Sequence, residues 1–150
     1  MIKTEPFASY DRAIRFATAA HEGQFRNDGI TPYITHPLAV AHATQAPVYV
    51  KVAAILHDVI EDTATTYDDL RNAGFEERSI DIVRLLTRTR DVTYMDYIKS
   101  IATSGNRFAI LVKMADIKHN ASTDTRDSMK SRYRNALDTL TRSYLNLSNS

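Results

Sequence analysis

The segment AAILHDVIED, residues 53–62, carries four ionisable side chains within six positions of an otherwise apolar run: His57, Asp58, Glu61 and Asp62. On a helical wheel, at about 100° per residue, these four fall within an arc of roughly 140°. A solvent-exposed face near a helix end would explain such an arc. The preceding VKVAAIL predicts burial, however, and three carboxylates beside one imidazole on a buried helix would repel one another without a cation. The segment therefore indicates a cation site.

A second histidine stands at the start of a predicted helix. In PYITHPLAV, a loop bounded by prolines delivers His36 to that start and holds its imidazole rigidly toward a neighbouring element. Taken alone, His36 fits a capping or core histidine better than a ligand.

Asp116 is a third polar group embedded in apolar sequence, in ILVKMADIKHN. It shares a helical turn with Lys113, and Asn120 lies four positions further on, on the same face. An ion pair between Asp116 and Lys113 or Arg107 would explain this residue by itself. Three such groups in one chain are explained more economically by one shared site.

The elements that must position these groups are predicted to be helices. Capping residues, Gly and Pro signals and the spacing of apolar residues mark eight segments: 9–23, 36–46, 47–62, 66–74, 75–89, 93–105, 106–122 and 127–147. Ser9 or Asp11 caps the first, and Pro37 occupies the first position of the second. Strands have little support, because no paired alternating runs joined by hairpin turns occur. We expect an all-α, single-domain bundle of about seven or eight helices spanning residues 1–150.

Composition limits the classes of function. The 150 residues are enough to bury roughly 70% of the surface of the unfolded chain. No run approaches the ~18 apolar residues of a membrane span, and the start MIKTEPFASYDR shows no secretory signal. The 19 basic and 18 acidic residues predict no large nucleic-acid surface, and zero cysteines exclude disulfides and thiolate chemistry. A soluble, cytoplasmic protein is expected.

Three strings resemble, in order and spacing, the hydrolase domain of the bifunctional alarmone synthetase/hydrolases and the small alarmone hydrolases. They are AHEGQFRNDGITPYITHPLAVA, AAILHDVIEDTATTYDDL and RFAILVKMADIKHN. These RelA/SpoT-type enzymes are HD-domain metal-dependent phosphohydrolases that act on the signalling nucleotides of the stringent response. The resemblance covers about residues 10–140, and the combination of three motifs is far more specific than a His-Asp pair alone.

The resemblance implies a metal centre. The positions that match the family's metal ligands are His36, His57, Asp58 and Asp116. Manganese is the usual ion, and two imidazoles with two carboxylates suit it or another divalent cation. Glu61 and Asp62 match the acidic pair that orients or activates the attacking water.

The resemblance also implies contacts with a small-molecule nucleotide. Arg26 matches an arginine that contacts the nucleotide, Asn120 matches an asparagine that contacts the nucleoside, and Lys113 is a candidate for binding phosphate. Arg26 could equally be a surface charge. Arg132, Tyr133 and Arg134 in the last helix could reach phosphates, although an ordinary charged face is favoured.

Two departures from the family concern the substrate. Asn27 stands where a second basic residue is common, and Ile117-Lys118 replaces a common Arg-Leu.

The motifs and the resemblance together lead to the hypothesis of a hydrolase that removes the 3′-pyrophosphate from (p)ppGpp and releases pyrophosphate with GDP or GTP. The alternatives are hydrolysis of an adenosine alarmone or of the 2′-phosphate of NADPH, and a non-catalytic nucleotide-binding module. The intact Glu61-Asp62 pair argues against the binding module, and buried acids argue against a helical adaptor. The sequence does not predict an oligomeric state.

Overall fold

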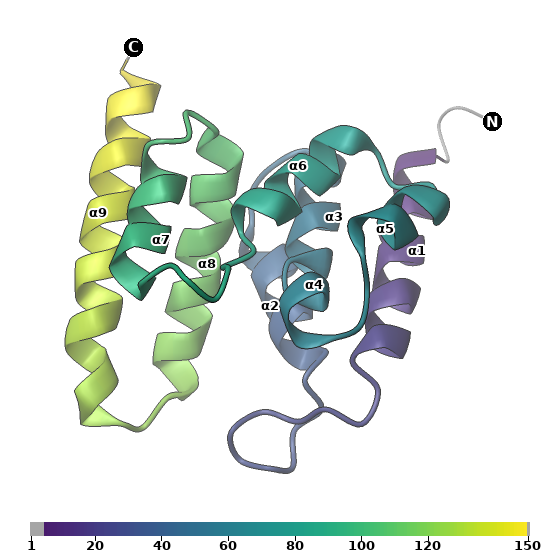
Figure 1. Ribbon diagram of the computed structural model, residues 1–150, viewed down its shortest axis with the longest axis horizontal. Coiled ribbons are helices and arrows are strands. Elements are labelled where there is room, and N and C mark those ends of the chain that lie inside the picture. Colours follow the sequence, from purple (N-terminus) through teal and green to yellow (C-terminus); the bar gives the residue numbers. More distant parts are fainter. Residues whose placement is uncertain (1–4, 150) are drawn as a thin grey trace.

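The computed structural model describes residues 5–149, with side chains from residue 8 onward. Its elements are α1 (Glu5–Ala20), α2 (Thr35–Ala43), α3 (Val48–Leu56), α4 (Val59–Asp62), α5 (Tyr67–Asn72), α6 (Glu77–Leu85), α7 (Tyr94–Ala102), α8 (Arg107–Thr123), the 3₁₀ turn η2 (Asp127–Met129) and α9 (Lys130–Ser148) (Figure 1). Within this range, β-pairing is limited to one bridge between Phe25 and Pro32. The predicted all-α bundle is confirmed.

One predicted helix is interrupted at the segment of interest. Residues 47–62 form α3 and the single turn α4, separated by His57 and Asp58. The ring nitrogen Nδ1 of His57 bonds the carbonyl oxygen of Ala54 at 2.6 Å, and this is the acceptor that the backbone of Asp58 would use in a continuing helix. The backbone of Asp58, at φ −103° and ψ −4°, departs from helical values. The prediction of one continuous helical face was therefore wrong.

Several helix boundaries follow local sequence signals. Thr66 begins α5 with a capping box to Asp69, Thr93 caps α7, and Asn106 caps α8. Two predicted starts were wrong: α1 begins at Glu5, so Ser9 and Asp11 lie inside it, and Pro37 is the third residue of α2. Pro37 still lies in the first turn, where a missing N–H breaks no helical hydrogen bond.

Helix α3 forms the centre of the molecule. Six of its nine residues are buried at 1% exposure or less: Val50, Val52, Ala53, Ala54, Ile55 and Leu56. It packs against α1, α2, α6 and α8, so little of its surface faces water. Helix α8 packs against α2 and α3 on one side and α9 on the other, and so joins the two groups of helices seen in Figure 1. The carboxyl end of α3 therefore lies close to α2 and α8.

None of the helices in residues 5–149 combines the length and the apolar character needed to cross a membrane.

Candidate metal centre

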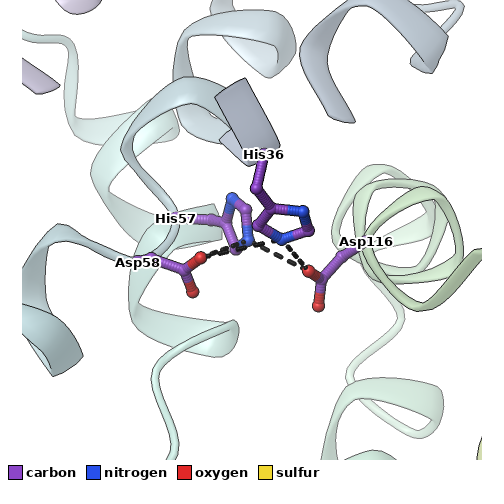
Figure 2. A group of neighbouring side chains, drawn as sticks. All are labelled: His36, His57, Asp58 and Asp116. Atoms are coloured by element: carbon purple, nitrogen blue, oxygen red, sulfur yellow. Dashed lines mark hydrogen bonds and ion pairs between the residues drawn. The ribbon is translucent and has the colours of Figure 1, made fainter. Parts of the chain in front are cut away.

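Four polar side chains from three parts of the chain meet where the carboxyl end of α3 lies close to α2 and α8 (Figure 2). His36 comes from α2, His57 and Asp58 from the break between α3 and α4, and Asp116 from α8, and one ligand atom of each lies within 4.8 Å of the others. Nε2 of His36 lies 2.7 Å from Oδ1 of Asp116 and 3.8 Å from Oδ2 of Asp58. Nε2 of His57 lies 3.3 Å from Oδ1 of Asp116 and 3.1 Å from Oδ2 of Asp58.

This group has the composition and burial of a site for a divalent ion. His36, His57 and Asp116 are 1%, 2% and 4% exposed, and the side chain of Asp58 is 15% exposed. Two imidazole nitrogens and two carboxylate oxygens are ligands that first-row divalent metals accept. Buried carboxylates this close together need a cation, and the residues present therefore fit a divalent ion.

The two imidazoles of the group are both held through Nδ1. His57 bonds a backbone carbonyl, as described above, and Nδ1 of His36 lies 2.7 Å from Nδ1 of His119. Each ring consequently turns Nε2 toward the carboxylates. This is the arrangement in which Nε2 can serve as a metal ligand.

The charges of the group are strongly coupled. Burial lowers the pKa of His57, but Asp58 and Asp116 outweigh it, so the pKa lies well above the ordinary value. Burial raises the pKa of Asp58, yet His57 outweighs it and brings the pKa to about 2. The pKa of Asp116 lies well below its usual range because Lys113 and His57 together exceed the effect of burial. Without a metal, the proton on His57 supplies positive charge that a dication can replace.

Lys113 is part of the site. Its Nζ lies 2.7 Å from Oδ2 of Asp116 and 5.0 Å from the ring centroid of Tyr97, and its side chain is only 12% exposed. The ion pair that the sequence suggested as an alternative explanation for Asp116 is present, and it coexists with the contacts of Asp116 to both histidines.

Glu61 and Asp62 border the four-residue group without joining it. A carboxylate oxygen of Glu61 accepts the backbone N–H of Arg88, and the backbone carbonyl of Asp62 accepts a hydrogen bond from Nε2 of Gln24 at 2.8 Å. Desolvation is the main cause that raises the pKa of both carboxyls, and Asp58 adds to it. A raised pKa makes each carboxylate a better acceptor of a proton.

The loop before α2 positions Arg26. Gly29 adopts φ +71°, and the carboxylate of Asp28 accepts the backbone N–H groups of Ile30 and Thr31, both at 2.8 Å. The backbone N–H of Arg26 donates to the carbonyl of Thr31 at 2.8 Å, which closes the loop. The guanidinium of Arg26 is thus carried on a well-bonded hairpin.

Arg26 and Asn120 are brought together by the fold. Nη2 of Arg26 donates to Oδ1 of Asn120 and to Oγ1 of Thr123, both at 3.0 Å. Nδ2 of Asn120 donates to Oδ1 of Asp116 at 3.3 Å, so Asn120 links Arg26 to the four-residue group. A cavity of about 150 Å³ lies beside them, lined by Arg26, Asn27, Asp28, Thr31, Thr35, His119 and Thr123.

Tyr33 also contacts the four-residue group, and it was not among the site residues predicted from the sequence. Its hydroxyl donates to Oδ2 of Asp58 at 2.6 Å. Its pKa is raised by burial and by Asp58, so it stays a donor. Its position three residues before His36, in the same motif, was the available signal.

A basic and aromatic face next to the site was also missed in part. The guanidinium carbon of Arg132 lies 4.4 Å from the ring centroid of Tyr94, and that of Arg88 lies 5.9 Å from it. Together with Lys113 over Tyr97, these residues form what we call the basic–aromatic face. Tyr133, by contrast, donates to Asp124, and Arg134 lines a different cavity, of about 360 Å³. No sequence signal pointed to Arg88, which follows the end of α6.

The chain is similar in sequence to known proteins. A family model described as the HD domain matches residues 13–130. The guanosine-3′,5′-bis(diphosphate) 3′-pyrophosphohydrolase of Haemophilus influenzae is 38% identical over 122 residues, which cover 71% of this chain and 17% of that protein. The bifunctional (p)ppGpp synthase/hydrolase SpoT of Escherichia coli is 35% identical over 124 residues, covering 75% of this chain and 17% of that protein.

A solved structure gives the same result for the fold. It comes from work on a metazoan ortholog of SpoT that hydrolyses ppGpp, and it superposes with a TM-score of 0.67 at 21% identity, over 93% of this chain and 85% of that one. The chain spans only 17% of the length of the two bacterial relatives. The match of the family model over residues 13–130 shows that this chain belongs to the HD-domain family.

Proposed function

We propose that this protein is a divalent-metal-dependent nucleotide hydrolase that removes the 3′-pyrophosphate of (p)ppGpp. The observation that carries the proposal is the buried group of His36, His57, Asp58 and Asp116, whose ligand atoms lie within 4.8 Å of one another. The names of the relatives from H. influenzae and E. coli support the choice of nucleotide.

The four residues of that group would hold the ion, through Nε2 of each histidine and an oxygen of each aspartate. We propose manganese, in line with the family, although the donor set suits other divalent ions. A bound dication lowers the pKa of a water ligand and offsets the negative charge of the phosphates.

Glu61 and Asp62 would handle the water that attacks. In the reaction, the oxygen of one water joins the phosphorus next to the 3′-oxygen of the ribose, and the bond between that phosphorus and the 3′-oxygen breaks. The attacking water would lose its proton to a carboxylate, and the hydrogen bond from the backbone N–H of Arg88, which holds the side chain of Glu61, supports Glu61 in that role. The 3′-oxygen leaves as a hydroxyl, so one water is consumed and pyrophosphate and GDP or GTP are released.

The surroundings suit a highly charged nucleotide. The basic–aromatic face offers three cations, on Lys113, Arg88 and Arg132, beside the acidic pair. Phosphate groups are bound well by such charge-assisted hydrogen bonds. Arg26 and Asn120, on the other side of Asp116, would contact the nucleoside. We expect the partner to be a nucleotide and not a nucleic acid, and a cytoplasmic location stays a prediction from the sequence.

The test is a comparison of substrates with the manganese-loaded protein. Equal concentrations of ppGpp, its adenosine counterpart, NADPH and GTP are incubated, and the products are separated by anion-exchange chromatography. We expect GDP and pyrophosphate in equal amounts from ppGpp, with Asp58→Asn inactive and the exposed-site control Asp81→Asn unaffected. Release of inorganic phosphate from NADPH in preference to cleavage of ppGpp would replace the proposed substrate. Binding of ppGpp without any product would identify a binding module.

A further inference from the structure

A pair of histidines lies directly behind the candidate metal centre. Nδ1 of His119 and Nδ1 of His36 are 2.7 Å apart, and the two rings stack with their centroids 4.9 Å apart and their planes at 29°. His36 is 1% exposed, while His119 is half-buried. Two ring nitrogens at this distance share one hydrogen bond, so one of them donates and the other accepts.

The two histidines of the metal centre are held in different ways. Nδ1 of His57 faces the backbone carbonyl of Ala54 at 2.6 Å. A carbonyl only accepts, so it fixes the proton of a neutral His57 on Nδ1 and leaves the lone pair on Nε2. Nδ1 of His36 instead faces the side chain of His119, which, unlike a backbone carbonyl, can be replaced by mutation.

Helix α8 carries both Asp116, a candidate metal ligand, and His119. Asp116 and His119 are three positions apart and therefore lie on neighbouring parts of one helix face. Asp116 approaches Nε2 of His36 while His119 approaches Nδ1 of the same ring. The ring of His36 is thus held at both of its nitrogens by one helix.

We propose that His119 is a positioning residue that accepts the Nδ1–H of His36 when the divalent ion is bound, and so leaves the lone pair of Nε2 for the ion. Without the ion, Nε2 of His36 donates to Oδ1 of Asp116 at 2.7 Å. This inference rests on the proposed metal centre. A neutral imidazole has one N–H, so a lone pair on Nε2 requires the proton on Nδ1, and that proton needs an acceptor when the ring is buried. Partners of this kind behind a ligating histidine commonly change metal affinity by about 10- to 100-fold when removed.

The experiment compares manganese affinity in four proteins prepared free of metal. His119→Phe keeps an aromatic ring but removes the acceptor. His119→Asn removes the ring but keeps an acceptor, because Oδ1 of asparagine is as many bonds from Cα as Nδ1 of histidine. His42→Phe is the matched control, since His42 is an exposed histidine on the same helix as His36. Free manganese is measured by electron paramagnetic resonance during titration, and circular dichroism verifies the fold of each variant.

We expect His119→Phe to weaken manganese binding by about tenfold or more. His119→Asn should stay close to the parent, and His42→Phe should match it. Equal manganese affinities of the parent and His119→Phe would overturn this inference alone. An equal loss of affinity in His119→Asn and His119→Phe would also overturn it, because the hydrogen-bond acceptor would then have no effect. A parent protein that binds no divalent ion would overturn the proposed function together with this inference.

Discussion

The ammonium group of Lys113 lies 2.7 Å from Oδ2 of Asp116, one turn away on the same helix. The other oxygen of this carboxylate, Oδ1, lies 2.7 Å from Nε2 of His36. Asp116 therefore uses one oxygen for a fixed internal cation and the other for the candidate metal centre. Lys113 compensates charge in the absence of a metal, and it also repels a second cation that approaches the site.

Replacing Lys113 by methionine should separate these two effects. In the metal-free protein we expect the free energy of unfolding to fall by roughly 3 kcal/mol, because a buried carboxylate loses its partner. The affinity for manganese should rise, because a like charge has been removed. Urea denaturation and manganese titration measure the two quantities. Lys118→Met, at an exposed lysine of the same helix, is the control and should change neither. Unchanged stability in Lys113→Met would contradict the structural role of the pair.

The stability of the metal-free protein should depend on pH in a defined direction. The pKa of His57 is raised, so its contribution is complete below its ordinary value of 6.5 and is lost as the pH rises through the value in the folded protein. The pKa of Asp58 is lowered from 3.8 to about 2, so its contribution is present above 3.8 and is lost as the pH falls toward 2. The raised pKa values of Glu61 and Asp62 add to the decline toward neutral pH.

The free energy of unfolding in the presence of a chelator should therefore be highest in mildly acidic buffer, above pH 3.8 and below pH 6.5. Manganese bound at the proposed site would require a neutral His57, so its affinity should increase with pH and should oppose the decline at neutral pH. Urea denaturation over a pH series, with and without manganese, measures both effects. A metal-free protein that becomes more stable between pH 6 and 8 would show that His57 has no raised pKa.

Glu61→Gln should separate chemistry from binding. The amide keeps the shape of the side chain but cannot take up a proton, so we expect kcat to fall by about 10²-fold or more while metal and nucleotide affinities are retained. The measurement is steady-state hydrolysis of ppGpp together with equilibrium binding. Glu22→Gln, at an exposed glutamate, serves as the control. Activity of Glu61→Gln within a few-fold of the parent would remove Glu61 from the mechanism.

Arg132→Ala should weaken phosphate binding specifically. Loss of a charge-assisted contact predicts an increase in KM of about tenfold, and a weaker dependence of KM on salt, because one screened ionic contact is gone. The neighbouring Arg134→Ala is a close control, since Arg134 lines the separate cavity near Asp124. The KM of each variant, measured at two ionic strengths, tests this prediction. Equal effects of the two substitutions would assign Arg132 to general surface charge.

Asn27→Lys tests the position at which the sequence departs from its family. Asn27 lines the cavity beside Arg26, so a lysine there would add a positive charge close to the proposed position of the nucleotide. We expect kcat/KM for ppGpp to improve relative to less phosphorylated competitors, with a gain that shrinks as salt rises. Competing-substrate kinetics measure the preference, and an unchanged ratio would show that residue 27 does not contact the phosphates.

Local sequence determined most of the helices, because caps and apolar spacing act between near neighbours in the chain. Thr66, Thr93 and Asn106 begin their helices as predicted. The three motifs also predicted that His36, His57, Asp58 and Asp116 share one site, and the fold brings these four residues together. Their role as metal ligands stays a prediction.

The tertiary structure decided how that site is held and what surrounds it. The contacts between Tyr33 and Asp58 and between His36 and His119 join residues 25 and 83 positions apart. Such contacts arise from the packing of α2 and α8 against α3 and against each other, and the periodicity of a single helix does not reveal them. The break between α3 and α4 has the same origin, since burial makes the His57 ring bond the Ala54 carbonyl instead of water. Arg88 and Arg132 likewise meet at Tyr94 only because the chain folds back.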